Sequence, residues 1–127
     1  MQSSSKRDRL SRIRQSLRRL SQDIQKLMPD LAERLPMVKG TVYEQRRKCG
    51  KPTCACAHGE LHGSMILSRS QGGRTKLISI SPDQVAQLRV LTARYQRFRR
   101  ARARLGRIYK TMLSLIDQLE AARLKEP

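Results

Sequence analysis

Residues 10–31 read LSRIRQSLRRLSQDIQKLMPDL, and this stretch decides much of the fold. Its apolar residues recur at alternating intervals of three and four, a heptad pattern typical of a helix that packs along one seam. We therefore expect one helix over about residues 5–28, and Pro29 should kink or break it before a further turn toward residue 35. The seam positions are Leu10, Ile13, Leu17, Leu20, Ile24, Leu27 and Leu31.

A second heptad pattern begins at Ser81-Pro82-Asp83-Gln84. Serine can cap a helix, proline suits its first position, and Gln84 completes a capping box, so this motif predicts a helix start. We expect the helix to span residues 82–124. Its predicted seam consists of Leu88, Leu91, Tyr95, Phe98, Arg102, Leu105, Tyr109, Met112, Ile116 and Leu119.

Between the two helical patterns the period changes to two. Residues 41–48, 64–70 and 74–80 read as strands, and Gln71-Gly72-Gly73 is a hairpin signal between the last two. We expect a small antiparallel sheet. A sheet of this size is marginal in water by itself, so it needs additional support.

These elements predict a mostly helical α+β fold. Two long helices form an antiparallel coiled-coil hairpin, and a small β module lies between them in the chain. The length of 127 residues fits one domain, divided into an N-terminal helix (5–35), the β module (41–80) and a long basic helix (82–124). Apolar residues make up only 38%, which favours paired helices over a thick core.

A cluster of cysteines and histidines lies between the first two predicted strands. Tetrahedral Zn²⁺ takes four thiolate or imidazole ligands, and the segment supplies Cys49, Cys54, Cys56 and either His58 or His62. We favour His62, because the longer spacing after Cys56 lets the chain loop back. Four such ligands leave no open position, so the expected Zn²⁺ is structural and staples the β module. Ordinary thiols, a disulfide and Fe–S ligation are the alternatives.

The Cys-x₄-Cys-x-Cys-x₅-His-Gly core also carries a family resemblance. Together with Tyr43-Glu44-Gln45 before it and the Gly-rich hairpin and basic helix after it, the core resembles an uncharacterised family of small bacterial and archaeal proteins, a domain of unknown function. The resemblance covers roughly residues 15–105. It implies that Cys49, Cys54, Cys56 and His62 form one site, and that the protein accompanies transposons or other mobile elements. Ser64-Met65 departs from the proline and tyrosines that members usually carry there.

The net charge of +18 predicts a polyanionic partner. Only three tyrosines and one phenylalanine occur, too few for a base-stacking platform, so phosphate contacts are the expected mode. The longest aliphatic run, Met65-Ile66-Leu67, is too short for a membrane span or a signal peptide. We therefore expect no membrane association and a cytoplasmic, nucleoid-associated protein.

The basic residues concentrate beside the metal loop and along the second helix. No carboxylate occurs between Asp83 and Asp117, and four arginines of that interval repeat at 3-4-3 spacing on one helix face. Lys39, Arg69, Arg74 and Lys76 could extend the first cluster. The cations that we expect to contact nucleic acid are Arg46, Arg47, Lys48, Lys51, Arg94, Arg97, Arg99, Arg100, Arg104, Arg107 and Lys110.

The sequence thus predicts a non-enzymatic, zinc-containing protein that binds nucleic acid, with DNA favoured over RNA and little sequence preference. We expect no enzymatic activity, because no cluster of catalytic carboxylates or poised nucleophile is visible. The family resemblance implies an accessory role in a mobile-element or other nucleoprotein assembly. One alternative is a coiled-coil adaptor that recruits a transposase or recombinase. Another is a ribosome-associated RNA-binding protein. The helix seams also make a homodimer conceivable.

Overall fold

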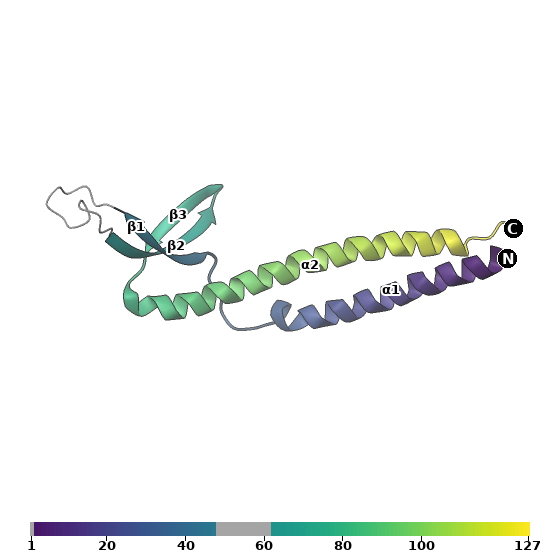
Figure 1. The fold of residues 1–127 in the computed structure, drawn as a ribbon, viewed down its shortest axis with the longest axis horizontal. Coiled ribbons are helices and arrows are strands. Elements are labelled where there is room, and N and C mark those ends of the chain that lie inside the picture. The colour runs from purple at the N-terminus through teal and green to yellow at the C-terminus, as the bar shows by residue number, and fades with distance from the viewer. Residues whose placement is uncertain (1, 48–61) are drawn as a thin grey trace. The chain divides into compact units, whose positions relative to one another are not determined.

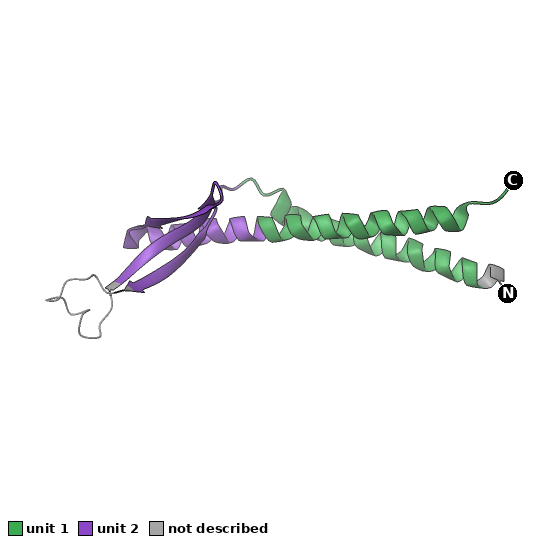
Figure 2. Cartoon of the chain, turned by 90° about the horizontal axis from the view of Figure 1, so that it is seen from above, with its two compact units in different colours: residues 1–34, 98–127 green, residues 35–97 purple. Residues whose placement is uncertain are grey.

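The structure, a computed structural model, describes residues 2–47 and 62–127 (Figure 1). It is a mostly helical α+β fold with two helices and a small three-stranded antiparallel sheet, which confirms the expected fold class at this level. The chain divides into two compact units, one formed by residues 1–34 and 98–127, the other by residues 35–97 (Figure 2). The elements in chain order are α1 (Gln2–Leu31), β1 (Thr41–Arg47), β2 (His62–Gln71), β3 (Arg74–Ser79), the short 3₁₀ helix η2 (Pro82–Gln84) and α2 (Val85–Arg123).

Helix α1 continues through Pro29 and ends at Leu31, so the expected break at the proline and the extension to residue 35 are both wrong. Proline removes one hydrogen bond and its ring crowds the carbonyl four residues earlier, but only Asp30 and Leu31 follow Pro29 in the helix, so little helix lies beyond the disturbed turn. The backbone N–H of Ala32 donates to the carbonyl of Met28 at 2.8 Å and closes the last turn. Every heptad position of α1 is buried or half-buried, and Ile13 is 5% exposed.

The buried stripe of α2 differs from the predicted seam. Tyr109 is 52% exposed and Ile116 is 46% exposed, while Ala101 and Ile108 are each 4% exposed. The two patterns share Phe98, Leu105, Met112 and Leu119. Between these shared positions, the buried residue lies one position earlier than predicted, which changes the order of the three- and four-residue intervals but keeps both. In residues 98–127 the buried or half-buried positions of α2 are Phe98, Ala101, Leu105, Ile108, Met112, Leu115, Leu119 and Ala122.

Both helical segments of this unit contribute to one cavity. Leu10 and Arg14 of α1 line it together with Leu119 and Arg123 of α2. The early turns of α1 therefore lie beside the last turns of α2.

The three strands form a sheet in the order β1-β2-β3. Gly72 and Gly73 connect β2 to β3, with φ values of 59° and 78°. Such a pair of left-handed residues makes the two-residue turn that matches the twist of a hairpin, which confirms the sequence signal at residues 71–73. In the register, Val42 pairs with Leu67, and Leu67 pairs with Ile78.

Backbone hydrogen bonds connect β2 to Ile80, and the segment before β1 to α2. The N–H of Ile80 donates to the carbonyl of Met65 at 3.0 Å, and the N–H of Val38 donates to the carbonyl of Leu91 at 3.1 Å. Ile66 and Leu67 are 4% and 5% exposed although they point to opposite sides of the sheet, so both faces carry some apolar cover at this position.

The start of the second helical region follows the sequence signal in part. The side-chain Oε1 of Gln84 accepts hydrogen bonds from the Ser81 backbone N–H at 3.1 Å and from its hydroxyl at 2.9 Å. The first turn is the 3₁₀ helix η2, and regular α-helix begins at Val85. Gln84 thereby satisfies a backbone donor at the predicted boundary.

The shifted seam of α2 generates a direct test with two neighbouring positions. Ala101→Asp places a charge at a buried position and should lower the free energy of unfolding by about 2–4 kcal/mol. Arg102→Asp lies on the exposed side and should change it by about 0.5 kcal/mol or less. Thermal unfolding followed by circular dichroism measures both. The reverse order of the two effects would restore the seam predicted from the sequence.

Candidate nucleic-acid interface

The strand register gathers the described basic side chains of the sheet on one face. Side chains alternate along a strand and paired residues share a face, so Val42, Leu67 and Ile78 mark this side. By the same alternation, four cations from all three strands lie on it. We call this the basic sheet face: Arg46, Arg69, Arg74 and Lys76.

The end of the basic sheet face at the β1–β2 loop is partly neutralised. Glu44 shares the face, and its Oε1 lies 3.1 Å from the Nε of Arg46. The carboxylate also covers Gly63, where a β-carbon would lie 2.5 Å from Oε1. The other end is different, because Arg69 and Lys76 are directly paired across the strands. Like charges in directly opposed positions destabilise a hairpin, so this end favours an anion.

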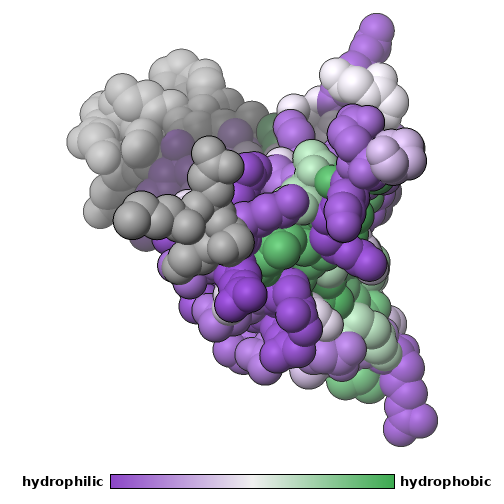
Figure 3. All heavy atoms as spheres, turned by 90° about the vertical axis from the view of Figure 1, so that its right-hand side faces the viewer, coloured by the Kyte–Doolittle hydropathy of each residue, from purple (hydrophilic) through white to green (hydrophobic). Residues whose placement is uncertain are grey.

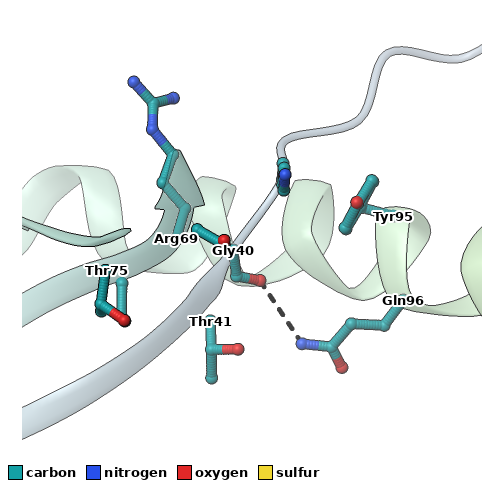
Figure 4. A pocket seen from close by; sticks show the side chains of 9 residues that line it. Gly40, Thr41, Arg69, Thr75, Tyr95 and Gln96 are labelled. Atoms are coloured by element: carbon teal, nitrogen blue, oxygen red, sulfur yellow. Dashed lines mark hydrogen bonds between the residues drawn. The ribbon is translucent and has the colours of Figure 1, made fainter. Parts of the chain in front are cut away.

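A shallow cavity of about 310 Å³ adjoins this end of the sheet (Figure 4). Gly40, with a φ of 138°, forms part of its wall, and the side-chain amide of Gln96 donates to the Gly40 carbonyl at 3.5 Å. Lys39 and Arg69 line the cavity and also line a second one beside Gly72 and Gly73. Two cations thus border adjacent hollows near the hairpin turn.

The arginines of α2 form the second candidate surface. In residues 98–127, the predicted contacts Arg99, Arg100, Arg104, Arg107 and Lys110 are all exposed. Helix geometry of about 100° per residue places Arg100, Arg104 and Arg107 along one flank, which we call the arginine flank. Among the described residues, none of these three has an ion-pair partner. Their mutual repulsion is therefore unrelieved by the described chain.

Two predicted contacts of α2 lie in the other unit and differ from each other. Arg97 is exposed, whereas Arg94 is half-buried. The guanidinium of Arg94 donates from Nη1 to the carbonyl of Pro36 at 2.8 Å. Arg94 therefore helps to fix the segment before β1, a role that the sequence pattern did not indicate.

Several predicted site residues lie outside the described residues: Lys48, Lys51, Cys49, Cys54, Cys56 and the alternative ligand His58. His62 begins β2 and Arg47 ends β1, but their side chains are not described. Within the described ranges 2–47 and 62–127, no group of three His, Cys, Asp or Glu side chains could hold a metal ion. The zinc site consequently stays a prediction.

The shared face of the sheet cations is the part of the site that sequence reasoning missed. The sequence indicated that the first basic cluster could extend to Arg69, Arg74 and Lys76. It did not indicate that these side chains share one face of the sheet. Residue numbers alone could have shown it. A two-residue turn after Gln71 pairs odd-numbered residues of β2 with even-numbered residues of β3, and paired residues lie on the same face of the sheet.

The comparisons with known proteins give a family without an activity. A family described as a domain of unknown function (DUF6788) matches residues 8–90. No curated protein and no solved structure matches the chain. The matched range includes α1 from residue 8 onward, the sheet and the first turns of α2, and it ends before the arginine flank. In the described part of the chain, neither helix has the length and apolar character needed to cross a membrane.

Gly40 provides a test of the geometry around the cavity. A β-carbon there would lie 2.7 Å from the Ser68 carbonyl oxygen, and its φ of 138° is rare for other residues. Gly40→Ala should destabilise the fold by about 2 kcal/mol or more. Gly106 is the control, because it is helical and a β-carbon at this position would meet no atom within 4 Å.

Gly106→Ala should stabilise the protein by up to about 1 kcal/mol, since alanine has the higher helix propensity. Urea unfolding of both variants checks the opposite signs. Equal stabilities of Gly40→Ala and the unsubstituted chain would contradict the strained conformation at residue 40.

Proposed function

We propose that this chain, which belongs to the DUF6788 family of domains of unknown function, binds nucleic acid through its phosphates without catalysing a reaction. The observation that carries the proposal is the placement of unneutralised cations at mutually repulsive positions. These are the arginine flank of α2 and the Arg69–Lys76 pair of the basic sheet face. We favour duplex DNA, in an accessory role within a mobile-element or other nucleoprotein assembly.

The arginine flank has the chemistry and the spacing of a phosphate contact. Guanidinium groups bind phosphate oxygens through two parallel hydrogen bonds. Arg100 and Arg107 are separated by about 10 Å along the helix axis, the rise of roughly three nucleotides of one strand of a duplex. A phosphate run beside this flank would relieve the repulsion among the three arginines.

The basic sheet face supports the same partner by an independent route. Arg69, Arg74 and Lys76 lie near a glycine turn with little side-chain bulk, and Lys39 and Arg69 border the cavity beside that turn. The opposite face at this end carries uncharged residues, namely Ser68, Ser70, Thr75 and Leu77. A charge asymmetry of this kind favours a polyanion on one side of the hairpin.

The scaffold that presents the arginine flank is, in our proposal, an antiparallel coiled-coil hairpin of α1 and α2. The cavity lined by Leu10 and Leu119 supports this pairing, as do the 3-4 spacings of the buried positions of both helices. Burial of this stripe holds the repelling arginines on a helix that they would otherwise destabilise.

A structural Zn²⁺ completes the proposed β module. Arg47 pairs with His62, so the segment that contains Cys49, Cys54 and Cys56 leaves and re-enters the sheet at one end of the β1–β2 ladder. Three thiolates and the His62 imidazole are the donor set that tetrahedral Zn²⁺ requires. The bound ion would fix this loop, and with it Lys48 and Lys51.

The salt dependence of DNA binding tests the phosphate contacts. Each neutralised phosphate contributes a slope of about −0.9 in log affinity against log salt, so Arg100→Gln/Arg104→Gln/Arg107→Gln should flatten the slope by about 2.5–3. The loss should be similar for unrelated sequences, because phosphate contacts carry little base information. Fluorescence anisotropy with two labelled duplexes of different sequence measures both effects.

A matched control removes the same charge from exposed arginines of α1: Arg7→Gln/Arg14→Gln/Arg18→Gln. It should leave the slope within about 1 of the unsubstituted chain. Equal slopes for the two triple variants would refute the arginine flank as a contact surface. Tighter binding to duplex RNA than to duplex DNA would contradict our choice of DNA and support the ribosomal alternative.

Metal content tests the staple separately from DNA binding. The purified chain should contain about one zinc per molecule, and Cys54→Ser or His62→Asn should lose it. His58→Asn should retain the metal, because His58 is not needed in the proposed set. Elemental analysis after dialysis measures the stoichiometry. Loss of zinc from His58→Asn but not from His62→Asn would show that His58 is the fourth ligand. A metal-free chain with a folded sheet would contradict the proposed structural role of zinc.

A further inference from the structure

An apolar stripe on α2 remains exposed after the fold has formed. Tyr109, Leu113 and Ile116 are 52%, 62% and 46% exposed, and their 4-3 spacing puts them on one side of the helix. In Figure 3, which views the molecule from the side of both chain ends, hydrophobic surface lies open between hydrophilic residues. We call these three residues the outer stripe. Exposed apolar residues aligned in this way favour contact with another helix.

The segment around the outer stripe has no net charge, unlike the preceding part of α2. Residues 109–127 contain three cations and three carboxylates, whereas the whole chain has a net charge of +18. A second copy of the chain would meet strong repulsion along the preceding part of α2, where residues 85–108 hold eight arginines and no carboxylate. Residues 109–127 carry no net charge, so a second copy would meet no net repulsion there. This segment therefore suits a partner that is itself strongly positive.

We propose that two copies of the chain associate through the outer stripe, with their α2 helices antiparallel. The spacing extends to Glu120, so antiparallel pairing brings Leu113 opposite Ile116 of the second copy twice, once on each side of the two-fold axis. Tyr109 then lies opposite Glu120 of the second copy, where its hydroxyl can donate to the carboxylate. Each copy presents the same patch, as a two-fold interface requires.

Charge complementarity favours the antiparallel direction. Lys110 and Asp117 flank the outer stripe on the same side, seven residues apart. Antiparallel pairing puts Lys110 of each copy beside Asp117 of the other and forms two symmetric ion pairs. In a parallel pair, like residues would lie at the same level and neither ion pair would form. Among the described residues, neither Lys110 nor Asp117 has an ion-pair partner within its own chain.

The interface is small and leaves the arginine flank open. At about 100° per residue, the outer stripe and the arginine flank lie on opposite sides of the buried stripe of α2. Dimerisation therefore does not compete with phosphate contacts at the arginine flank, and it assigns Lys110 to the dimer instead of to nucleic acid. Four layers of side chains make a limited contact, so we expect a dissociation constant on the order of 10–100 μM.

Reciprocal charge reversal tests the proposal without removing apolar residues. Sedimentation equilibrium of the full chain at about 0.15 M salt, which screens the repulsion between the two charged chains over about 8 Å, and up to roughly 0.5 mM protein should show a monomer–dimer equilibrium. Lys110→Asp and Asp117→Lys should each weaken dimerisation by roughly tenfold or more, because each puts like charges opposite one another. An equimolar mixture of the two variants should dimerise about as well as the unsubstituted chain.

The recovery in the mixture is specific to antiparallel pairing, since a variant that merely failed to fold would not regain partners. Leu113→Ser should weaken the dimer in every combination while its helix content stays unchanged by circular dichroism. A monomer at all concentrations would overturn the proposal and leave the outer stripe to a different protein. A dimer that is insensitive to both charge reversals, or a mixture that stays monomeric, would also overturn it.

Discussion

Repulsion between neighbouring cations is the constraint on which our account of this protein depends. Arg100, Arg104 and Arg107 follow one flank of α2 without an ion-pair partner among the described residues, and Arg69 faces Lys76 across the hairpin. Helices and hairpins ordinarily place opposite charges at such positions, where each pair adds a few tenths of a kcal/mol. A bound anion would therefore reduce this repulsion and stabilise the fold.

The buried residues determine which side chains face outward. Burial of Ala101 and Ile108 turns the arginine flank to one side of α2 and leaves Tyr109 and Ile116 exposed on the other. In the sheet, the register puts Arg69 and Lys76 on the face that also carries Leu67. Packing and surface charge are thus coupled through the periods of 3.6 and 2. One helix consequently presents two different surfaces, which we propose as sites for phosphates and for a second copy.

Much of the fold could be predicted from the sequence, because its local signals agree. The Gly72-Gly73 turn, the strands on either side of it and the boundary at Ser81 follow from backbone preferences of single residues. The phase of the α2 seam could not be predicted in the same way. Two heptad frames share Phe98, Leu105 and Met112 and differ by one residue elsewhere, so aromatic Tyr109 looked like a better core residue than its neighbour.

The candidate site was predictable to a lesser degree. Basic composition predicted a polyanionic partner, which stays a prediction. The 3-4-3 spacing indicated one helix face but did not show that Arg94 donates to the Pro36 carbonyl. That contact joins residues distant in sequence, and no periodic pattern reports it. Pro29 was also misjudged, because the cost of a proline depends on its distance from the helix end.

Arginine footprinting tests the central claim most directly. Phenylglyoxal modifies accessible guanidinium groups, and mass spectrometry locates the products with and without a saturating DNA duplex. We predict that DNA protects Arg100, Arg104, Arg107, Arg69 and Arg74, while the exposed arginines of α1, among them Arg7 and Arg18, stay reactive. Uniform protection of all arginines, or protection confined to α1, would contradict the assignment of phosphate contacts to these two surfaces.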